Sequence, residues 1–110
     1  MRYWAMLLSD RRRRLLADIV REVEASGLRL VEARFDKDAL GSLYIEVEGR
    51  VALGWDARDH VASIVNVMPG AKDGFLWTSE PTWDAHLLAS RLVEIAMQSA
   101  RGRTAQERKT

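Results

Sequence analysis

Apolar and polar positions follow two different periods along the chain, and these periods predict its elements. Between Ser9 and Gly27, apolar side chains recur at the spacing of a helix with one buried face: Leu15, Leu16, Ile19, Val20 and Val23. Ser9 is placed to cap this helix and Gly27 to end it. Residues 3–8 are apolar in both phases, so residues 1–8 fit either a backward extension of the helix or an additional edge strand.

Strand signals follow the first helix. Residues 28–35 are rich in branched and aromatic side chains, and residues 43–48 alternate strictly, with Leu43, Ile45 and Val47 on one side. Residues 51–55 continue this alternation after a short connection, which predicts a hairpin. Two more strands are predicted over residues 61–68 and residues 75–79.

A last helix is predicted from Trp83 to Arg101, with Thr82 as its cap and Gly102 as its stop. The basic segment 103–110 is predicted to be disordered. The order of elements predicts an α+β fold, in which an antiparallel meander of four to five strands is flanked by an N-terminal and a C-terminal helix packed on one face. A chain of 110 residues has room for one core, so residues 1–102 are predicted to form a single globular domain.

Composition narrows the class of protein. The apolar and charged fractions, 47% and 30%, are those of an ordinary globular domain. There is no cysteine, which excludes disulfides and thiolate chemistry. No apolar stretch is long enough to span a bilayer and no signal-peptide pattern is present, so we expect no membrane partner and a cytoplasmic location.

The heptapeptide "GWDARDH", residues 54–60, concentrates three side chains that can bind metals or transfer protons: Asp56, Asp59 and His60. A structural metal site usually needs a fourth ligand, and nothing near in sequence supplies it. Aspartate is also a favoured turn residue. We therefore interpret the heptapeptide as a polar loop between two strands.

The segment "DKDALG", residues 36–41, begins like a calcium-binding loop. Such a loop needs an oxygen ligand at its fifth place and a glutamate at its twelfth, where this chain has Leu40 and Val47. Neither a nucleophile elbow, a phosphate loop nor a dinucleotide fingerprint is present. The sequence predicts a protein that is not an enzyme, with no catalytic residue, no cofactor and no metal site.

Charge is segregated along the chain, and this indicates a macromolecular partner. Residues 1–34 carry a net charge of +3, residues 35–98 of −5 and residues 99–110 of +3. We hypothesise that acidic loops of the middle segment meet a basic surface on a protein partner, with a tryptophan as apolar anchor. The predicted partner-binding residues are Asp36, Asp38, Asp56, Asp59, His60 and Trp77.

The cluster Arg11–Arg14 keeps nucleic acid open as an alternative partner, because arginine neutralises phosphates. Four consecutive residues spread around a helix, however, so they do not form one basic stripe.

The acidic segment "FDKDALGSLYIEVEGRVALGWDARDH" and the closing helix "EPTWDAHLLASRLVEIAMQ" resemble the small α+β immunity proteins with which bacteria neutralise a cognate toxin. The resemblance implies tight binding to a toxin domain, occlusion or distortion of its active site, and residence in the cytoplasm. Secretion chaperones share a similar arrangement of helices and sheet, and would imply a homodimer that binds an unfolded effector segment. The residues do not separate these two expectations.

Overall fold

The computed structural model describes residues 2–36, 41–70 and 74–109, with the backbone alone for residues 2–9 and 101–109. A helix at each end of the chain encloses five strands in the order α1 (Arg2–Ala25), β1 (Leu30–Asp36), β2 (Ser42–Val47), β3 (Val51–Trp55), β4 (Ala62–Asn66), β5 (Phe75–Thr78) and α2 (Ala85–Lys109). The predicted α+β fold is confirmed, with five strands in the sheet.

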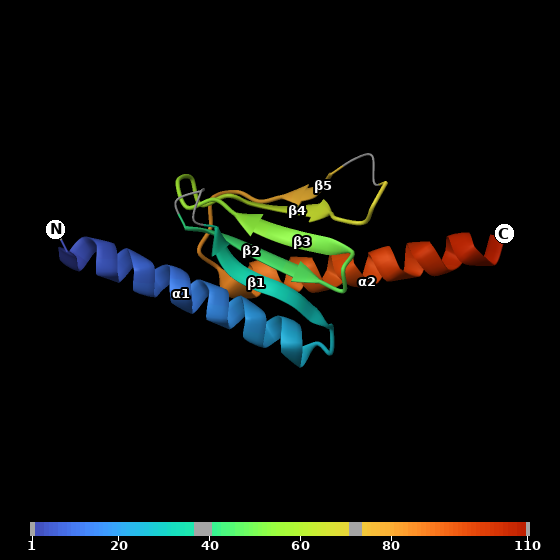
Figure 1. Cartoon of the computed structure of the whole chain (residues 1–110), viewed down its shortest axis with the longest axis horizontal. Coiled ribbons are helices and arrows are strands. Elements are labelled where there is room, and N and C mark those ends of the chain that lie inside the picture. Colours follow the sequence, from blue (N-terminus) through green and yellow to red (C-terminus); the bar gives the residue numbers. More distant parts are fainter. Residues whose placement is uncertain (1, 37–40, 71–73, 110) are drawn as a thin grey trace.

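The strands form an antiparallel meander in which each pairs with the next along the chain. In the middle of the sheet, Ile45 of β2 lies opposite Leu53 of β3, and Leu53 lies opposite Ile64 of β4. All three are fully buried, and because side chains alternate along a strand, their neighbours point to the other face. Both helices lie on the side of the buried residues and pack against each other there (Figure 1).

The core is a single cluster between the sheet and the two helices. Each helix contributes a stripe of apolar residues that lie on one helical face. The stripe of α1 is Leu15, Ile19 and Val23, and that of α2 is Leu88, Ala89, Leu92 and Ala96. The apolar face predicted for the first helix is therefore the one that the fold buries.

The first helix is longer than predicted. It begins at Arg2, so the predicted start at Ser9 is wrong, and of the two alternatives for residues 1–8 the backward extension is the one found for residues 2–8. No proline or glycine interrupts residues 2–25, so nothing in the backbone forces an earlier boundary.

The boundaries of α2 also correct the prediction. Asp84 is the cap, because its Oδ1 accepts a hydrogen bond from the Leu87 backbone nitrogen at 3.1 Å. Thr82 lies two residues before this cap, and its Oγ1 accepts a hydrogen bond from the Asp84 backbone nitrogen at 3.0 Å. The helix does not stop at Gly102 but continues to Lys109, through the segment predicted to be disordered. One glycine costs a helix only about 1 kcal/mol, and the following residues are mostly good helix formers.

Side chains also connect the two helices directly. His86 of α2 places its Nδ1 3.0 Å from Oε1 of Glu22 on α1. This hydrogen bond, together with the charge of Glu22, raises the pKa of His86. In the described part of the chain, neither helix combines the length and apolarity that a membrane span requires.

Leu53 is the best single test of the core, since it is 0% exposed at the centre of the sheet. We expect Leu53→Ala to lower the free energy of unfolding by about 2–5 kcal/mol, because it removes a buried side chain and leaves a cavity. Urea denaturation measures the change. The matched control is Glu24→Ala on the exposed side of α1, for which a change within about 0.5 kcal/mol is expected. Equal losses for both variants would contradict this core.

Candidate functional site

The outer face of the sheet, which points away from both helices, carries a row of side chains at its middle. Strand pairing places Tyr44 opposite Gly54, and Gly54 opposite Ser63. The same row continues to Arg34 on β1 and Thr78 on β5. Because Gly54 has no side chain, the row has a gap at its centre.

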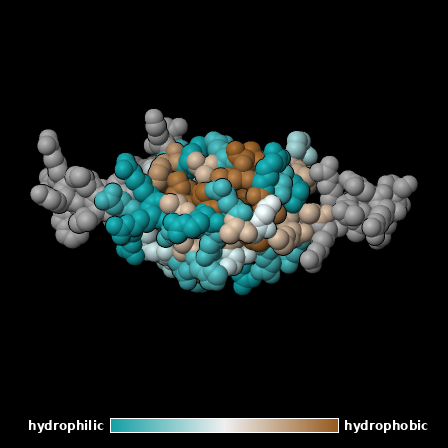
Figure 2. Space-filling model, turned by 90° about the horizontal axis from the view of Figure 1, so that it is seen from below, coloured by the Kyte–Doolittle hydropathy of each residue, from teal (hydrophilic) through white to brown (hydrophobic). Residues whose placement is uncertain are grey.

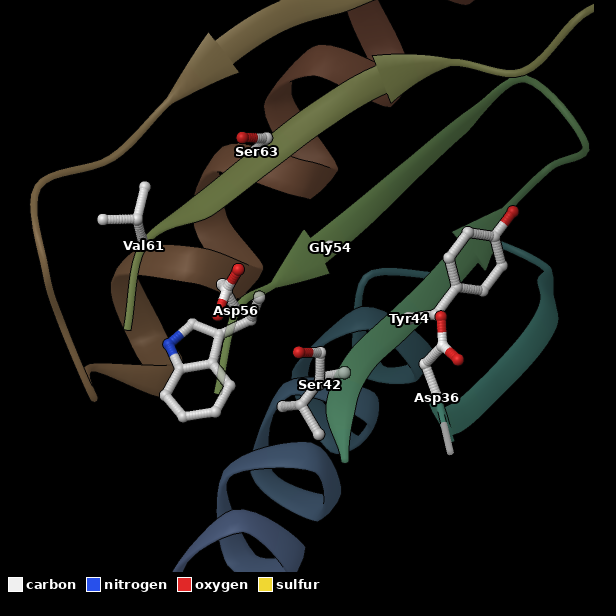
Figure 3. Close-up of a pocket in the computed structure, with 9 residues that line it drawn as sticks. Asp36, Ser42, Tyr44, Gly54, Asp56, Val61 and Ser63 are labelled. Atoms are coloured by element: carbon white, nitrogen blue, oxygen red, sulfur yellow. The ribbon is translucent and has the colours of Figure 1, made fainter. Parts of the chain in front are cut away.

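This gap is part of a hollow of about 290 Å³ that opens on the outer face. Figure 3 shows Tyr44 and Ser63 on its walls, with Asp36 and Asp56 at its rim. A Cβ placed on Gly54 would meet only the Leu43 carbonyl oxygen, at an ordinary 3.9 Å. The full lining comprises Asp36, Ser42, Leu43, Tyr44, Gly54, Trp55, Asp56, Val61 and Ser63.

Tyr44 is held in place by its neighbours. Its hydroxyl donates a hydrogen bond of 2.9 Å to Oε1 of Glu46, and the guanidinium of Arg34 lies 4.6 Å from the centre of its ring. Arg34 in turn donates from Nε to Oε1 of Glu32 at 2.7 Å. Burial, and then the hydrogen bond to Glu46, raise the pKa of Tyr44 to about 12. The ring is therefore a neutral, oriented wall of the hollow at physiological pH.

The heptapeptide 54–60 ends strand β3 and turns the chain beside the hollow. Two of its carboxylates hold the turn: Asp56 Oδ1 accepts from the Arg58 nitrogen at 2.7 Å, and Asp59 Oδ1 accepts from the Val61 nitrogen at 3.1 Å. Both aspartates remain exposed. Their charge thus lies at the surface of a turn whose shape depends on their oxygen atoms.

An aromatic cluster anchors the same turn to the start of α2. The ring of His60 stacks on Trp55 at 5.3 Å, and Trp83 meets Trp55 edge-on at 4.7 Å. Nε1 of Trp55 donates to the Thr82 carbonyl at 2.9 Å. The guanidinium of Arg11 lies 3.9 Å from the centre of the Trp83 ring. The imidazole of His60 is therefore packed among rings, in a loop residue with φ of 61°.

The predicted partner-binding residues lie in different parts of the structure. Asp36 and Asp56 both line the hollow, although they belong to different segments. Asp59 and His60 lie in the turn that follows. Trp77 lies opposite the buried Ile64 and packs against the core, so its ring is half-buried. Asp38 lies outside the described residues.

The sequence did not single out three residues of the outer face: Tyr44, Gly54 and Phe75. Phe75 is 73% exposed and lies opposite Val65 of β4, which lies opposite Ala52 of β3. These three residues lie side by side next to the row that contains the hollow, but Ala52 is fully buried, so Phe75 and part of Val65 form the accessible apolar surface. A glycine at an outward position of an alternating strand was the available signal, since glycine in a strand often marks a close approach of another group.

The four consecutive arginines are separated by their positions around α1. Arg11 contacts Trp83 and Arg12 is half-buried, whereas Arg13 and Arg14 are exposed. Among the residues whose placement is described, no three His, Asp or Glu side chains gather as a metal ion would require.

Comparison of the chain with known proteins gives no match. No protein-family model matches the chain, and no curated protein or solved structure matches it either. The functional argument therefore depends on the outer face itself.

Tyr44 offers a test of the wall of the hollow. The pKa of Tyr44 is higher in the folded chain, at about 12, than in the unfolded chain, at about 10. Tyr44 therefore contributes its full stabilisation below about pH 10, and this stabilisation is lost as the pH rises through about 12. We expect an absorbance titration to show one tyrosine that resists ionisation below about pH 11, and Tyr44→Phe to remove it. Glu46→Gln should lower this pKa only in part, since burial is the larger cause. An unchanged pKa in Glu46→Gln would contradict the hydrogen bond.

Proposed function

We propose that this chain is a protein-binding module that holds its partner on the outer face of the sheet, and that it acts as an immunity protein on a toxin domain. The observation that carries the proposal is the hollow at Gly54, on a sheet face that neither helix covers. The narrower assignment to toxin neutralisation comes from the resemblance of the acidic segment to immunity proteins.

The chemistry of the outer face supports protein recognition. Binding hot spots combine apolar or aromatic anchors with a surrounding polar rim. Here the exposed ring of Phe75, with the half-buried Val65 opposite it, supplies the apolar part, and the oriented ring of Tyr44 borders a hollow that can accept a partner side chain. The charged groups of Glu32, Arg34 and Glu46 lie around Tyr44 as part of the rim.

Electrostatics favour a basic partner. Residues 35–98, which include four of the five strands, carry the net charge of −5. Asp36 and Asp56 lie at the rim of the hollow, and Asp59 is exposed in the adjacent turn. A negative field of this kind speeds the encounter with a basic surface and disfavours acidic competitors.

Filling the hollow tests the site. In Gly54→Leu the new Cβ has space and the strand conformation suits leucine, so the fold should persist while the side chain occupies the hollow. The probe is the product of the reading frame next to this gene. We expect expression of this product to arrest growth, and we expect the wild-type chain but not Gly54→Leu to relieve the arrest. The Kd of Gly54→Leu for the product should be raised at least tenfold, which corresponds to about 1.4 kcal/mol.

The matched control places the same leucine on the helical side. Glu24→Leu, at an exposed position of α1, should bind and protect as the wild type does. A neighbouring product that neither arrests growth nor binds the chain would contradict the immunity function. Binding that Gly54→Leu leaves unchanged would contradict the outer face as its site.

The charge of the turn can be tested separately from its shape. In Asp56→Asn with Asp59→Asn, the amide oxygens can still accept the hydrogen bonds from Arg58 and Val61, but two negative charges are removed. We expect the association rate with the partner to fall by about tenfold at low salt, and the melting temperature to stay unchanged. Stopped-flow kinetics across a salt series measure this rate. An association rate equal to that of the wild type would show that these charges do not steer the partner.

A further inference from the structure

A second surface lies on the helical side of the molecule, between the C-terminal part of α1 and the middle of α2. It is a groove of about 600 Å³. Figure 2 views this side and shows apolar side chains gathered near its centre with hydrophilic ones around them. The groove is lined by Glu22, Ala25, Ser26, Ala89, Ser90, Val93, Glu94 and Met97.

The lining of the groove defines what it can bind. Ala25, Ala89, Val93 and Met97 supply an apolar surface, and Met97 is 39% exposed. The acidic lining residues come from both helices: Glu22 from α1 and Glu94 from α2. Glu22 contacts His86 and Glu94 contacts Arg91, so the apolar surface defines the ligand more than the charge does. A complementary ligand presents apolar side chains, and positive charge beside them can share the two carboxylates.

The chain contains one segment with this composition. Residues 3–8 read Tyr-Trp-Ala-Met-Leu-Leu, with Arg2 before them and the cluster Arg11–Arg14 shortly after them. They belong to the part of α1 that extends past the sheet (Figure 1). The later turns of the same helix are the ones that contribute to the core against the sheet.

This segment cannot reach the groove of its own molecule. Residues 2–25 form one continuous helix, and the groove begins at Glu22. Fourteen residues separate Leu8 from Glu22, which amounts to about 21 Å along the helix axis. The continuous helix keeps the two apart, so residues 3–8 can reach such a groove only on another molecule.

We propose that two copies of this chain associate reciprocally, each placing residues 3–8 of α1 in the groove between α1 and α2 of the other. The arrangement is two-fold, so each copy contributes the same two surfaces and the assembly is closed. The contact lies on the helical side and leaves the outer face of each sheet open. It is independent of the function proposed above.

The charges between the two contacts are compatible with this arrangement. When residues 5–8 of one α1 run antiparallel beside residues 22–25 of the other, Asp10 approaches Arg21 of the other copy. In the same register Arg13 approaches Asp18 of the other copy. All four side chains are exposed in the single chain, where Arg21 and Asp18 pair with each other at 3.3 Å. In the dimer, Arg21 and Asp18 would exchange this exposed ion pair for partners on the other copy.

Analytical ultracentrifugation of the full chain over a concentration series tests the proposal. We expect a dimer that Met97→Glu and Leu7→Glu each weaken at least tenfold, because either places a carboxylate in the apolar contact beside Glu22 and Glu94. The matched control is Leu87→Glu, which changes a residue of the same helix that is 37% exposed and outside the groove lining. This control, and Gly54→Leu on the outer face, should leave the dimer intact.

Cross-linking identifies the contact itself. The natural chain has no cysteine, so Leu7→Cys and Met97→Cys introduce single thiols. We expect the mixed variants to form a disulfide-linked heterodimer on mild oxidation, and to do so faster than either variant alone forms a homodimer. Circular dichroism confirms that each variant is folded.

Three results would overturn the proposal. The first is a chain that stays monomeric at concentrations up to about 100 μM, a range in which even a modest protein contact is detected. The second is a dimer that both Met97→Glu and Leu7→Glu leave unchanged. The third is a heterodimer cross-link no faster than the homodimer controls, which would place the contact elsewhere.

Discussion

One-sided burial of the sheet is the constraint on which the other features depend. Ile45, Leu53 and Ile64 lie side by side across three strands and are fully buried against the helices. Since alternate residues point to opposite faces, burying this set commits the other set to the opposite face. Gly54 and Tyr44 occupy that face for the same reason that Leu53 and Ile45 occupy the core. The hollow is thus a direct consequence of how the core is formed.

The same burial ties the Asp56 side of the hollow to the rest of the fold. Trp55 ends β3 within the core, and its indole nitrogen bonds to the Thr82 carbonyl just before α2. Its ring also stacks on His60, so the turn that carries Asp56 is tied to both the sheet and the second helix. A binding surface that is ordered before it meets a partner loses less conformational entropy on association. The aromatic cluster therefore supports recognition without contacting the partner itself.

Sequence patterns predicted the fold better than the site, because the strands follow from local patterns whereas the site depends on residues that are distant in sequence. The alternation of Leu43, Ile45 and Val47 is local, and it identified the strand and its buried face correctly. The hollow depends on cross-strand neighbours, and the pairing of Gly54 with Tyr44 and Ser63 appears only once the register is known. Where β5 pairs with β4, the register shifts between Ile64 and Val65 of β4. As a result, the ring of Phe75 points outward and the ring of Trp77 packs against the core. Such a shift has no clear signature in one sequence.

The segregation of charge acquires a physical meaning when both proposals are taken together. The basic residues 1–34 include α1, and the acidic residues 35–98 include most of the sheet. Association through the helices would place the basic N-terminal segments between the two copies, near the glutamates of the grooves, and leave two acidic sheet faces outward. A second binding event at such an assembly gains from the high effective concentration that the first one creates. The dimer would then bind a repetitive or dimeric basic partner more tightly than one domain can, with no new contact on the outer face.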